Sequence, residues 1–567
     1  MANFDDEKQK KRLDDLHRLE EEQLISTLAE SKYGIPYIDL YHHIVDNEAL
    51  RAIPEEEARE LKVAPFGLSG KNVLIALRSP QPEILSRLRG EMETKGLVAN
   101  FYMASGASLE KVWERYKELS MAKSSQIGGI EISAEVLRNT AKNISKMQDI
   151  AGVIGEALQG NSVHRVSRIL EIILAGAIAI GASDVHIEPE KDRARLRLRL
   201  DGVLQDVAFF GSDIYHLLNS RIKLLSGMKL TSQISQDGRF GITEGDEEIN
   251  IRGSLIPGSY GESIVLRILD PKSIQVKFEE LGIEPYLLSI IEGEIAKPNG
   301  MILVTGPTGS GKTTTLYAFL RKIYSPEINV VTIEDPVEYH IIGITQTQIS
   351  DKGKGYTFLE GLRSALRQDP DVIMVGEIRD SETARTAVQS ALTGHLVLST
   401  LHTNNAAGVI PRLVDLGVNP KIMVSALSLS MAQRLVRRLC RFCKVEKPAP
   451  EDMAQVIKSI VEGMKKEGKD LKKYNLKNID SPLKLFFPAG CDKCNATGYS
   501  GRIGIFEAIK TDEAIEKIIP ENPSEHEIKK VASRQGILSL RQDGVVKMLA
   551  GIASFEEVQS VVDLNEE

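Results

Sequence analysis

Short apolar runs alternate with stretches of helical pattern through the second half of the chain. The run Met301-Ile-Leu-Val-Thr predicts a buried strand, and similar runs at 330–333, 372–375 and 396–400 predict three more. Strands that alternate with helices are typical of a parallel sheet. The pattern therefore predicts an α/β fold for this part of the chain.

A strict alternation of a different kind precedes this region. In Ala194-Arg-Leu-Arg-Leu-Arg-Leu200 every second residue is an arginine, and a period of two predicts a strand with an apolar face and an arginine face. Arg195, Arg197 and Arg199 should therefore point to the same side. We interpret residues 163–270 as a separate, smaller α/β domain.

The chain of 567 residues is too long for one hydrophobic core, and changes of pattern divide it further. Short apolar runs broken by turns predict another small α/β domain in residues 24–117, and the polar, weakly periodic residues 118–160 favour a linker. The predicted parts are a charged segment at 1–23, a domain at 24–117, a linker at 118–160, a domain at 163–270, a hinge at 271–282, and a large domain at 283–567 that contains a cysteine module at 436–504 and ends in short helices.

Composition excludes some classes of protein. The net charge of −8 argues against a chain that coats nucleic acid. The most apolar stretch, Ile172 to Ala182, is much shorter than the roughly 20 residues of a bilayer span. The first 23 residues are charged and lack the apolar run of a signal peptide. We therefore expect a cytoplasmic protein that reaches the inner face of the membrane only through partners.

The strongest chemical signal follows the first of the buried strands. Gly306-Pro-Thr-Gly-Ser-Gly-Lys312-Thr313 has the spacing of a phosphate-binding loop, and it lies between a strand and a helix, which makes a chance match improbable. Its glycines let backbone N–H groups converge on a phosphate, Lys312 adds a positive charge, and the Thr313 hydroxyl can bind Mg²⁺. We predict a RecA-like ATPase core that binds ATP with Mg²⁺. The predicted nucleotide-binding residues are Gly306, Pro307, Thr308, Gly309, Ser310, Gly311, Lys312, Thr313 and Thr314.

Two acidic clusters follow later strands. Glu334-Asp335-Pro-Val-Glu338 follows 330–333, and Gly376-Glu377-Ile-Arg-Asp380 follows 372–375. Hydrolysis of ATP needs an acid near Mg²⁺ and a group that orients water, and these carboxylates are the candidates. The alternative is that they are ordinary surface carboxylates.

All four cysteines occur in two Cys-x₂-Cys pairs. In a cytosolic protein this spacing favours a tetrahedral zinc site over disulfides. Four sulfur ligands leave no position for water, so the site should be structural. The 47 residues between the pairs must then loop out. The predicted ligands of one Zn²⁺ per chain are Cys440, Cys443, Cys491 and Cys494.

Three segments after the phosphate loop resemble the boxes of one superfamily. Thr332 to Glu338, Gln368 to Asp380 and Thr393 to Thr403 look like the Asp box, the atypical Walker B motif and the His box of the secretion ATPases, in that order. Together with the cysteine pairs, they make the chain resemble the type II secretion and type IV pilus assembly ATPases. The resemblance is specific over residues 160–567 and looser over 24–117.

The resemblance implies a function and a set of partners. It implies a hexameric ring whose hydrolysis of ATP drives assembly of a pilin or pseudopilin fibre through an inner-membrane platform protein and an associated cytoplasmic ring protein. The 163–270 domain would be the PAS-like domain that precedes the ATPase core in this family. Direct contact with nucleic acid is not expected.

The resemblance also implies roles for individual residues. Glu338 would polarise the attacking water and Glu377 would be the acid on the Mg²⁺ side, with Glu334 and Asp335 in support. His395 and His402 would report the nucleotide state to the next strand and subunit, although a single histidine is often only structural.

Arginines complete the implied site. Arg363 and Arg367 are four residues apart and share a helix face. In this family such arginines, and Arg197 on the alternating strand, approach phosphates, some across a subunit boundary. The alternative for all three is an ordinary solvated face.

Other readings of the same residues remain. One is a retraction or DNA-uptake ATPase of the same superfamily, and another is a nucleotide-gated scaffold without significant turnover. The cysteine module favours assembly, because the retraction ATPases generally lack it. In some relatives the N-terminal domain binds cyclic di-GMP through Arg-Leu-Gly-type motifs. The first of these motifs is missing here, so cyclic di-GMP is not expected.

Overall fold

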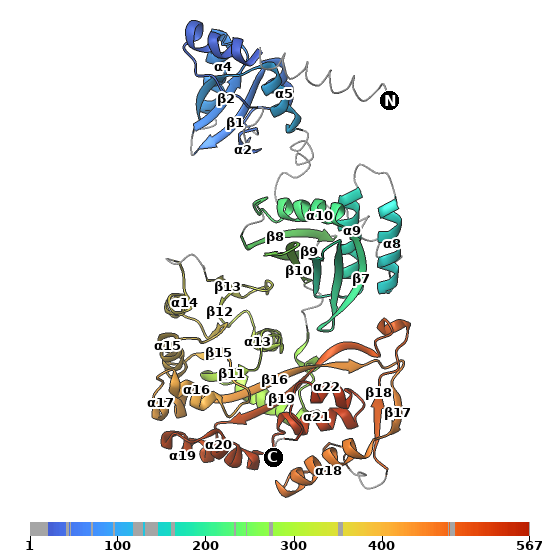
Figure 1. The fold of residues 1–567 in the computed structure, drawn as a ribbon. Helices are drawn as coiled ribbons and strands as arrows, with labels where there is room; N and C mark the ends of the chain where they lie inside the picture. The colour runs from blue at the N-terminus through green and yellow to red at the C-terminus, as the bar shows by residue number, and fades with distance from the viewer. Residues whose placement is uncertain are drawn as a thin grey trace. The chain divides into compact units, whose positions relative to one another are not determined.

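The computed structural model places the chain in two compact units, Met1–Gly129 and Ile130–Glu567, which we describe separately (Figure 1). The predicted segment 1–23 and the predicted linker 118–160 lie largely outside the part that can be described. The described residues are 21–40, 45, 47–50, 52–69, 72–94, 97–116, 129–130, 144, 146–159, 165–231, 234–244, 247–270, 276–349, 355–474, 476 and 482–565.

The first unit contains a small α/β fold around a three-stranded sheet. Strands β1 and β2 pair antiparallel, and β2 and β3 pair parallel. Val73, Ile75 and Leu77 on β2 are buried in its core, and the Ser105 side chain caps the N-terminus of α5. Its elements are η1 (Ala29–Tyr33), α2 (Asn47–Leu50), α3 (Glu55–Glu60), β1 (Val63–Ser69), β2 (Asn72–Leu77), α4 (Pro82–Thr94), β3 (Val98–Met103) and α5 (Gly106–Glu114).

The second unit begins with a domain built on an antiparallel sheet. Its strands follow the order β8-β9-β10-β5-β6-β7. The alternation predicted for residues 194–200 is confirmed, because every leucine of β6 is buried while its arginines are exposed or half-buried. The elements are α8 (Met147–Gln159), α9 (Arg165–Ala179), β5 (Asp184–Pro189), β6 (Arg193–Leu200), β7 (Val203–Gly211), α10 (Ser212–Leu225), β8 (Gln236–Glu244), β9 (Glu247–Gly258) and β10 (Gly261–Leu269), and β4 (Gly129–Ile130) lies at the boundary of the units.

Helix α8 corrects part of the linker prediction. It occupies residues 147–159, inside the segment 118–160 that the polar composition assigned to a linker. Ile150 and Ile154 are four residues apart and fully buried against α9. Apolar residues along the whole helix pack into the domain core, so the helix belongs to this domain.

The predicted ATPase core is a seven-stranded sheet with the order β13-β12-β14-β15-β11-β16-β19. All neighbouring pairs are parallel except β16 and β19. The four predicted apolar runs are confirmed as β11, β12, β14 and β15. The strands are β11 (Gly300–Thr305), β12 (Val330–Glu334), β13 (Thr345–Gln348), β14 (Val372–Val375), β15 (Leu396–Leu401), β16 (Leu427–Leu439) and β19 (Tyr499–Lys510).

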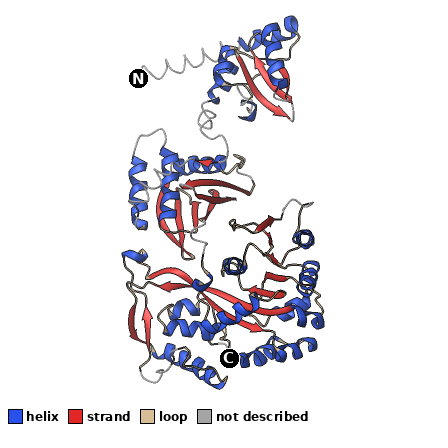
Figure 2. Cartoon of the chain, turned by 180° about the vertical axis from the view of Figure 1, so that it is seen from behind, coloured by secondary structure: helices blue, strands red, loops and turns tan. Residues whose placement is uncertain are grey.

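Helices cover both faces of this sheet (Figure 2). Alternate residues of one strand enter different cores: Met301 packs with α15 and α16, whereas Ile302 packs with α12 and α13. Strands β11, β12, β14 and β15 are buried along their whole length and are therefore mostly apolar, whereas the edge strand β13 is polar and partly exposed. The helices are η2 (Phe278–Glu280), α12 (Pro285–Ile295), α13 (Lys312–Ile323), α14 (Phe358–Ala365), η3 (Leu366–Gln368), α15 (Ser381–Leu392), α16 (Val409–Asp415), α17 (Pro420–Ala426), α19 (Glu513–Ile518), η5 (Ile519–Glu521), α20 (Glu525–Ala532), η6 (Ser533–Gln535), α21 (Leu540–Leu549) and α22 (Phe555–Gln559).

The cysteine module extends from the long strands β16 and β19 (Figure 1). Between the cysteine pairs, the chain forms the antiparallel pair β17 (Val445–Pro448) and β18 (Lys484–Phe487) and the helix α18 (Glu451–Lys466), and the turn η4 (Asp492–Cys494) lies within the second pair. The residues between the pairs therefore form an insertion, as the spacing predicted. Among the described helices, none has the length and apolar character that crossing a bilayer requires.

Candidate active site

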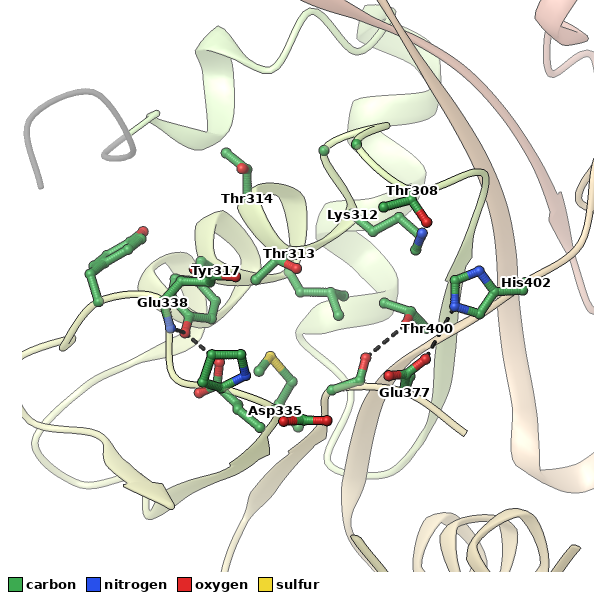
Figure 3. Close-up of a pocket in the computed structure, with 18 of the residues that line it drawn as sticks. Thr308, Lys312, Thr313, Thr314, Tyr317, Asp335, Glu338, Glu377, Thr400 and His402 are labelled. Carbon is green, nitrogen blue, oxygen red and sulfur yellow. Dashed lines mark hydrogen bonds and ion pairs between the residues drawn. The ribbon is translucent and has the colours of Figure 1, made fainter. Parts of the chain in front are cut away.

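The site lies where the carboxyl ends of parallel strands meet. Strands β11, β12, β14 and β15 all end at the same edge of the core sheet, and functional loops of α/β proteins gather at such edges. A pocket of about 510 Å³ opens there. The phosphate loop and both acidic clusters line it (Figure 3).

The phosphate loop has the backbone that its glycines predict. Gly306, Gly309 and Gly311 have φ values of 144°, 80° and 87°. Residues other than glycine rarely adopt such positive φ values. A Cβ on Gly306 would also lie 2.5 Å from the carbonyl oxygen of Gln433 on β16. The close approach of loop and strand thus requires glycine.

Lys312 begins helix α13 and lies within the loop. Its Nζ donates hydrogen bonds to the carbonyl oxygens of Gly306 at 2.8 Å and Pro307 at 3.1 Å. Burial lowers the pKa of the Lys312 ammonium, the carboxylate of Glu377 opposes this, and Arg434 adds to it. Thr313, the predicted magnesium ligand, follows on the exposed side of the helix start. A positive side chain at a helix N-terminus is suited to an anionic phosphate.

The second acidic cluster brings Glu377 into the same pocket. Its carboxylate contacts Arg379 Nη2 at 2.5 Å and His402 Nε2 at 3.1 Å. Burial alone would raise the pKa of Glu377, but these two partners lower it below its usual value. A carboxylate held in its charged form beside the phosphate loop is suited to the magnesium side of a nucleotide.

The two predicted histidines lie at opposite ends of β15. His402 follows the carboxyl end of the strand and lines the pocket (Figure 3). His395 precedes the strand, where its backbone carbonyl accepts from the N–H of Gly300 at the start of β11. A strand of this length separates its ends by roughly 20 Å. The structure therefore places His402, and not His395, at the pocket of this chain.

The first acidic cluster divides into three environments. Glu338 lines the pocket with about a third of its side chain exposed (32%), and Arg252 Nη1 contacts its carboxylate at 3.2 Å. Asp335 is exposed and also lines the pocket. Glu334 is only 2% exposed, and both of its carboxylate oxygens accept hydrogen bonds from neighbouring side chains. This placement does not fit the predicted support of Mg²⁺ by Glu334, because the buried carboxylate is already engaged.

The predicted arginines do not line this pocket. Arg197 pairs with Glu188 on β5. Arg363 and Arg367 are exposed on α14 and η3, and Arg367 Nη1 donates to the backbone carbonyl of Arg363 at 3.0 Å. The chain's own pocket therefore forms without them.

Other arginines line the pocket or contact the segment of Glu338 beside it, and sequence reasoning missed them. Arg252 on β9 also donates from Nη2 to the carbonyl oxygen of Val337 at 2.7 Å. Arg267 and Arg502 line the pocket from β10 and β19. Arg252 stands between buried Ile251 and Gly253 in an alternating strand, so the sequence indicated a polar face. It did not indicate what that face contacts.

Comparison with known proteins places the chain in a family. The family described as Type II/IV secretion system protein matches residues 159–560, which is most of the chain. The chain belongs to this secretion family. The predicted ATPase activity and the predicted α/β fold are thereby confirmed. A second family, the MshEN domain, matches residues 33–122, close to the predicted N-terminal domain.

Relatives of this secretion ATPase differ in how much of it they cover. It is 36% identical over 546 residues to the type IV pilus assembly ATPase PilB of Myxococcus xanthus, covering 95% of this chain and 91% of that protein. PilB of Thermus thermophilus is 37% identical over 544 residues, again covering 95% of this chain, which spans only 57% of that protein's length. The type II secretion system protein E of Klebsiella pneumoniae is 43% identical over 399 residues, covering 70% of this chain and 76% of that protein.

A solved structure agrees with the fold. The ATPase DotB of Yersinia pseudotuberculosis superposes with a TM-score of 0.50 at 19% identity, covering 70% of this chain and 94% of the other. At that identity the likeness supports the fold alone.

The four cysteines of this secretion ATPase converge on one point. Their sulfur atoms all lie within 4.8 Å of one another. The Cys440–Cys491, Cys443–Cys494 and Cys491–Cys494 separations are 3.9, 3.8 and 3.8 Å. Metal–sulfur bonds of about 2.3 Å at tetrahedral angles put sulfurs roughly 3.8 Å apart. The cluster therefore fits a single tetrahedral ion.

The surroundings of Cys494 favour a thiolate. Burial would raise the pKa of its thiol, but backbone N–H groups of Cys491 and Gly498 oppose burial and lower the pKa to about 7. The Gly498 N–H lies 3.2 Å from the sulfur. The thiolate is the form that binds metal.

Proposed function

We propose that this chain forms a homohexameric ring that hydrolyses ATP to power assembly of a type IV pilus or a type II secretion pseudopilus through an inner-membrane platform protein. The observation that carries the proposal is the similarity to two pilus assembly ATPases along 95% of the chain, which includes the N-terminal unit and the cysteine module. The N-terminal domain would dock to membrane partners. The ring would then act at the inner face of the cytoplasmic membrane.

The proposed mechanism assigns one task to each group at the pocket edge. The phosphate loop and Lys312 hold the phosphates, and Thr313 with Glu377 holds the magnesium ion. Glu338 orients and polarises the water that attacks the terminal phosphate, a task that a partly exposed carboxylate at the pocket edge can perform. His402 links Glu377 to the end of β15, so a change at the nucleotide can reach that strand.

The predicted arginines take part in this proposal as residues that act between subunits. Arg363 and Arg367 are exposed and lie outside the chain's own pocket, which is the placement expected of groups that serve a neighbour. Arg197 belongs to the arginine face of β6 and already has an acidic partner in Glu188. Its part in hydrolysis therefore requires exchange of that partner for a phosphate.

For the cysteine cluster we propose one structural Zn²⁺ per chain. Four sulfur ligands with near-tetrahedral separations leave no open position on the ion, which is the arrangement of a structural site. The ion would join the end of β16 to the start of β19. It would fix the base of the insertion that carries β17, β18 and α18.

The motor function is tested in the native host. A strain whose chromosomal copy carries Lys312→Ala is expected to lose its surface fibres or its secreted substrates, and a plasmid copy of the natural gene should restore them. The variant protein must be present at natural levels, as shown by immunoblot. Normal fibres and normal secretion in the variant strain would exclude the proposed role.

A further inference from the structure

Tyr317 is a fully buried residue of α13, the helix that begins at Lys312. Its ring packs edge-to-face on the ring of Tyr339, with centroids 4.7 Å apart. The side chain extends toward the first acidic cluster and ends beside Glu338 (Figure 3). Nothing in the phosphate-loop chemistry requires a tyrosine at this position.

The Tyr317 hydroxyl uses its full hydrogen-bonding capacity. A phenol has one hydrogen to donate and can accept two hydrogen bonds. Here it donates to the carboxylate of Glu334, and it accepts from the backbone N–H of Glu338 at 3.4 Å and from Gln346 Nε2 at 3.3 Å. One buried hydroxyl thus joins the phosphate-loop helix, the end of β12 and the segment that carries Glu338.

Glu334 anchors this arrangement in the core. Its carboxylate also accepts from Thr332 Oγ1 at 2.5 Å and from Gln346 Nε2 at 3.1 Å. Burial raises the pKa of Glu334, and the hydrogen bonds from Thr332, Tyr317 and Gln346 oppose that rise. A buried carboxylate with several donors is costly to displace, so the acceptor for the Tyr317 hydroxyl is fixed in place.

Glu338 needs such an anchor because its own segment is irregular. No helix or strand is formed between the end of β12 at Glu334 and the start of β13 at Thr345, and these residues are all described. The Glu338 side chain is about one-third exposed, so packing alone does not fix it. Arg252 holds the segment from the preceding domain. Within the ATPase core, Tyr317 contacts this segment at the backbone of Glu338, and Gln346 contacts it farther along, at Tyr339 and Ile341.

We propose that Tyr317 is a positioning residue for ATP hydrolysis: its hydroxyl fixes the backbone of Glu338 and thereby sets the place of the Glu338 carboxylate relative to the phosphate loop. Lys312 and Tyr317 lie on the same helix, so one rigid element sets the positions of both the phosphates and the water-orienting acid. The inference rests on the proposed role of Glu338.

The direct test is Tyr317→Phe, which keeps the ring and removes the hydroxyl. We expect kcat to fall about tenfold, while the KM for ATP changes less than about twofold, because the hydroxyl positions the acid and does not bind nucleotide. The matched control is Thr332→Val, which removes a different buried hydrogen bond to Glu334. It should lower the thermal midpoint by a similar amount and keep kcat within about twofold of the natural protein.

The coupling of Tyr317 to Glu338 is tested by repeating the substitution in a Glu338→Gln background. If Tyr317 acts only through Glu338, Tyr317→Phe should lower kcat there by less than about twofold. A further tenfold loss of kcat in the Glu338→Gln background overturns the inference, and so does a wild-type kcat for the single variant Tyr317→Phe. Either result leaves the proposed role of Glu338 intact. If Glu338→Gln itself turns over at the natural rate, the proposed role of Glu338 fails and the inference fails with it.

A second variant serves if Tyr317→Phe does not fold. Gln346→Met removes the side chain that donates to the Tyr317 hydroxyl alongside the backbone N–H of Glu338, with little change in volume. It also removes the hydrogen bonds of Gln346 to Glu334, Tyr339 and Ile341. We expect a smaller fall in kcat, about threefold, again absent when Glu338 is glutamine. An unchanged kcat in a folded Gln346→Met protein also overturns the inference.

Discussion

The cysteine cluster and the nucleotide pocket are built in contrasting ways. The cluster takes all four ligands from two short turns, one beside the end of β16 and the other just before β19. The pocket takes its lining from the phosphate loop, from loops after three other strands, and from arginines of distant strands. A site made from local turns can be read from residue spacing alone. For a site at a sheet edge, the sequence predicts the separate loops but not the contacts between them.

The largest effect should come from Lys312→Ala, and it should be confined to the pocket. Removing the ammonium takes away the positive charge that the phosphates need, so we expect phosphate release to fall by about a thousandfold. Zinc content by elemental analysis should remain at the natural value. A loss of zinc in this variant would show that the two regions depend on each other.

Glu338→Gln should give the next largest effect. The amide can still hydrogen-bond to water but polarises it poorly, so turnover should fall about a hundredfold while binding of a fluorescent ATP analogue is retained. If turnover stays at the wild-type rate, Asp335 or Glu377 becomes the candidate for polarising the attacking water. If binding is lost as well, the carboxylate contributes to the nucleotide site itself.

Cys491→Ser should act mainly on the other region. One lost thiolate opens the tetrahedral site, so zinc should fall well below one ion per chain and the thermal midpoint should drop by several degrees. Hydrolysis should suffer much less than in Lys312→Ala. A variant that keeps its zinc contradicts the four-cysteine site, and a variant as inactive as Lys312→Ala contradicts the separation of the two regions.

The smallest effect should come from Arg252→Gln. Arg252 and Glu338 are both about one-third exposed (30% and 32%), and exposed ion pairs contribute little, about 0–1 kcal/mol. We therefore expect kcat to change by less than about fivefold, measured by steady-state phosphate release with Lys277→Gln as a control for loss of one positive charge. A much larger loss would make Arg252 a part of the catalytic machinery.

The same contrast explains which sequence predictions succeeded. The phosphate loop and the β6 alternation are local patterns, and the structure has both as expected. His395 and His402 look equivalent in sequence, yet a strand of six residues places them at opposite ends. Glu334 and Glu338 look equivalent too. The strand β12 ends at Glu334 and buries it, while Glu338 is already in the loop.

Long-range contacts could not be predicted in this way. The hydrogen bond from Arg252 to Val337 joins residues 85 positions apart, and nothing in either local sequence specifies the partner. The hydrogen bonds of the buried Tyr317 hydroxyl could not be predicted for the same reason. Tyr317 lies on α13, whereas its partners Glu334 and Glu338 lie at and after the end of β12. Helix α8 was missed for another reason: the whole segment 118–160 was interpreted as a linker from its polar composition, although the apolar residues of the helix pack on α9.

The central claim is that hydrolysis belongs to a ring and not to an isolated chain. It is tested most directly by measuring phosphate release per chain across a range of protein concentrations, with the mass of the particles measured in the same samples. The account predicts that specific activity rises with the hexamer fraction, and that an Arg197→Ala chain mixed with a Lys312→Ala chain partly regains turnover. A monomer whose specific activity is independent of concentration would contradict it.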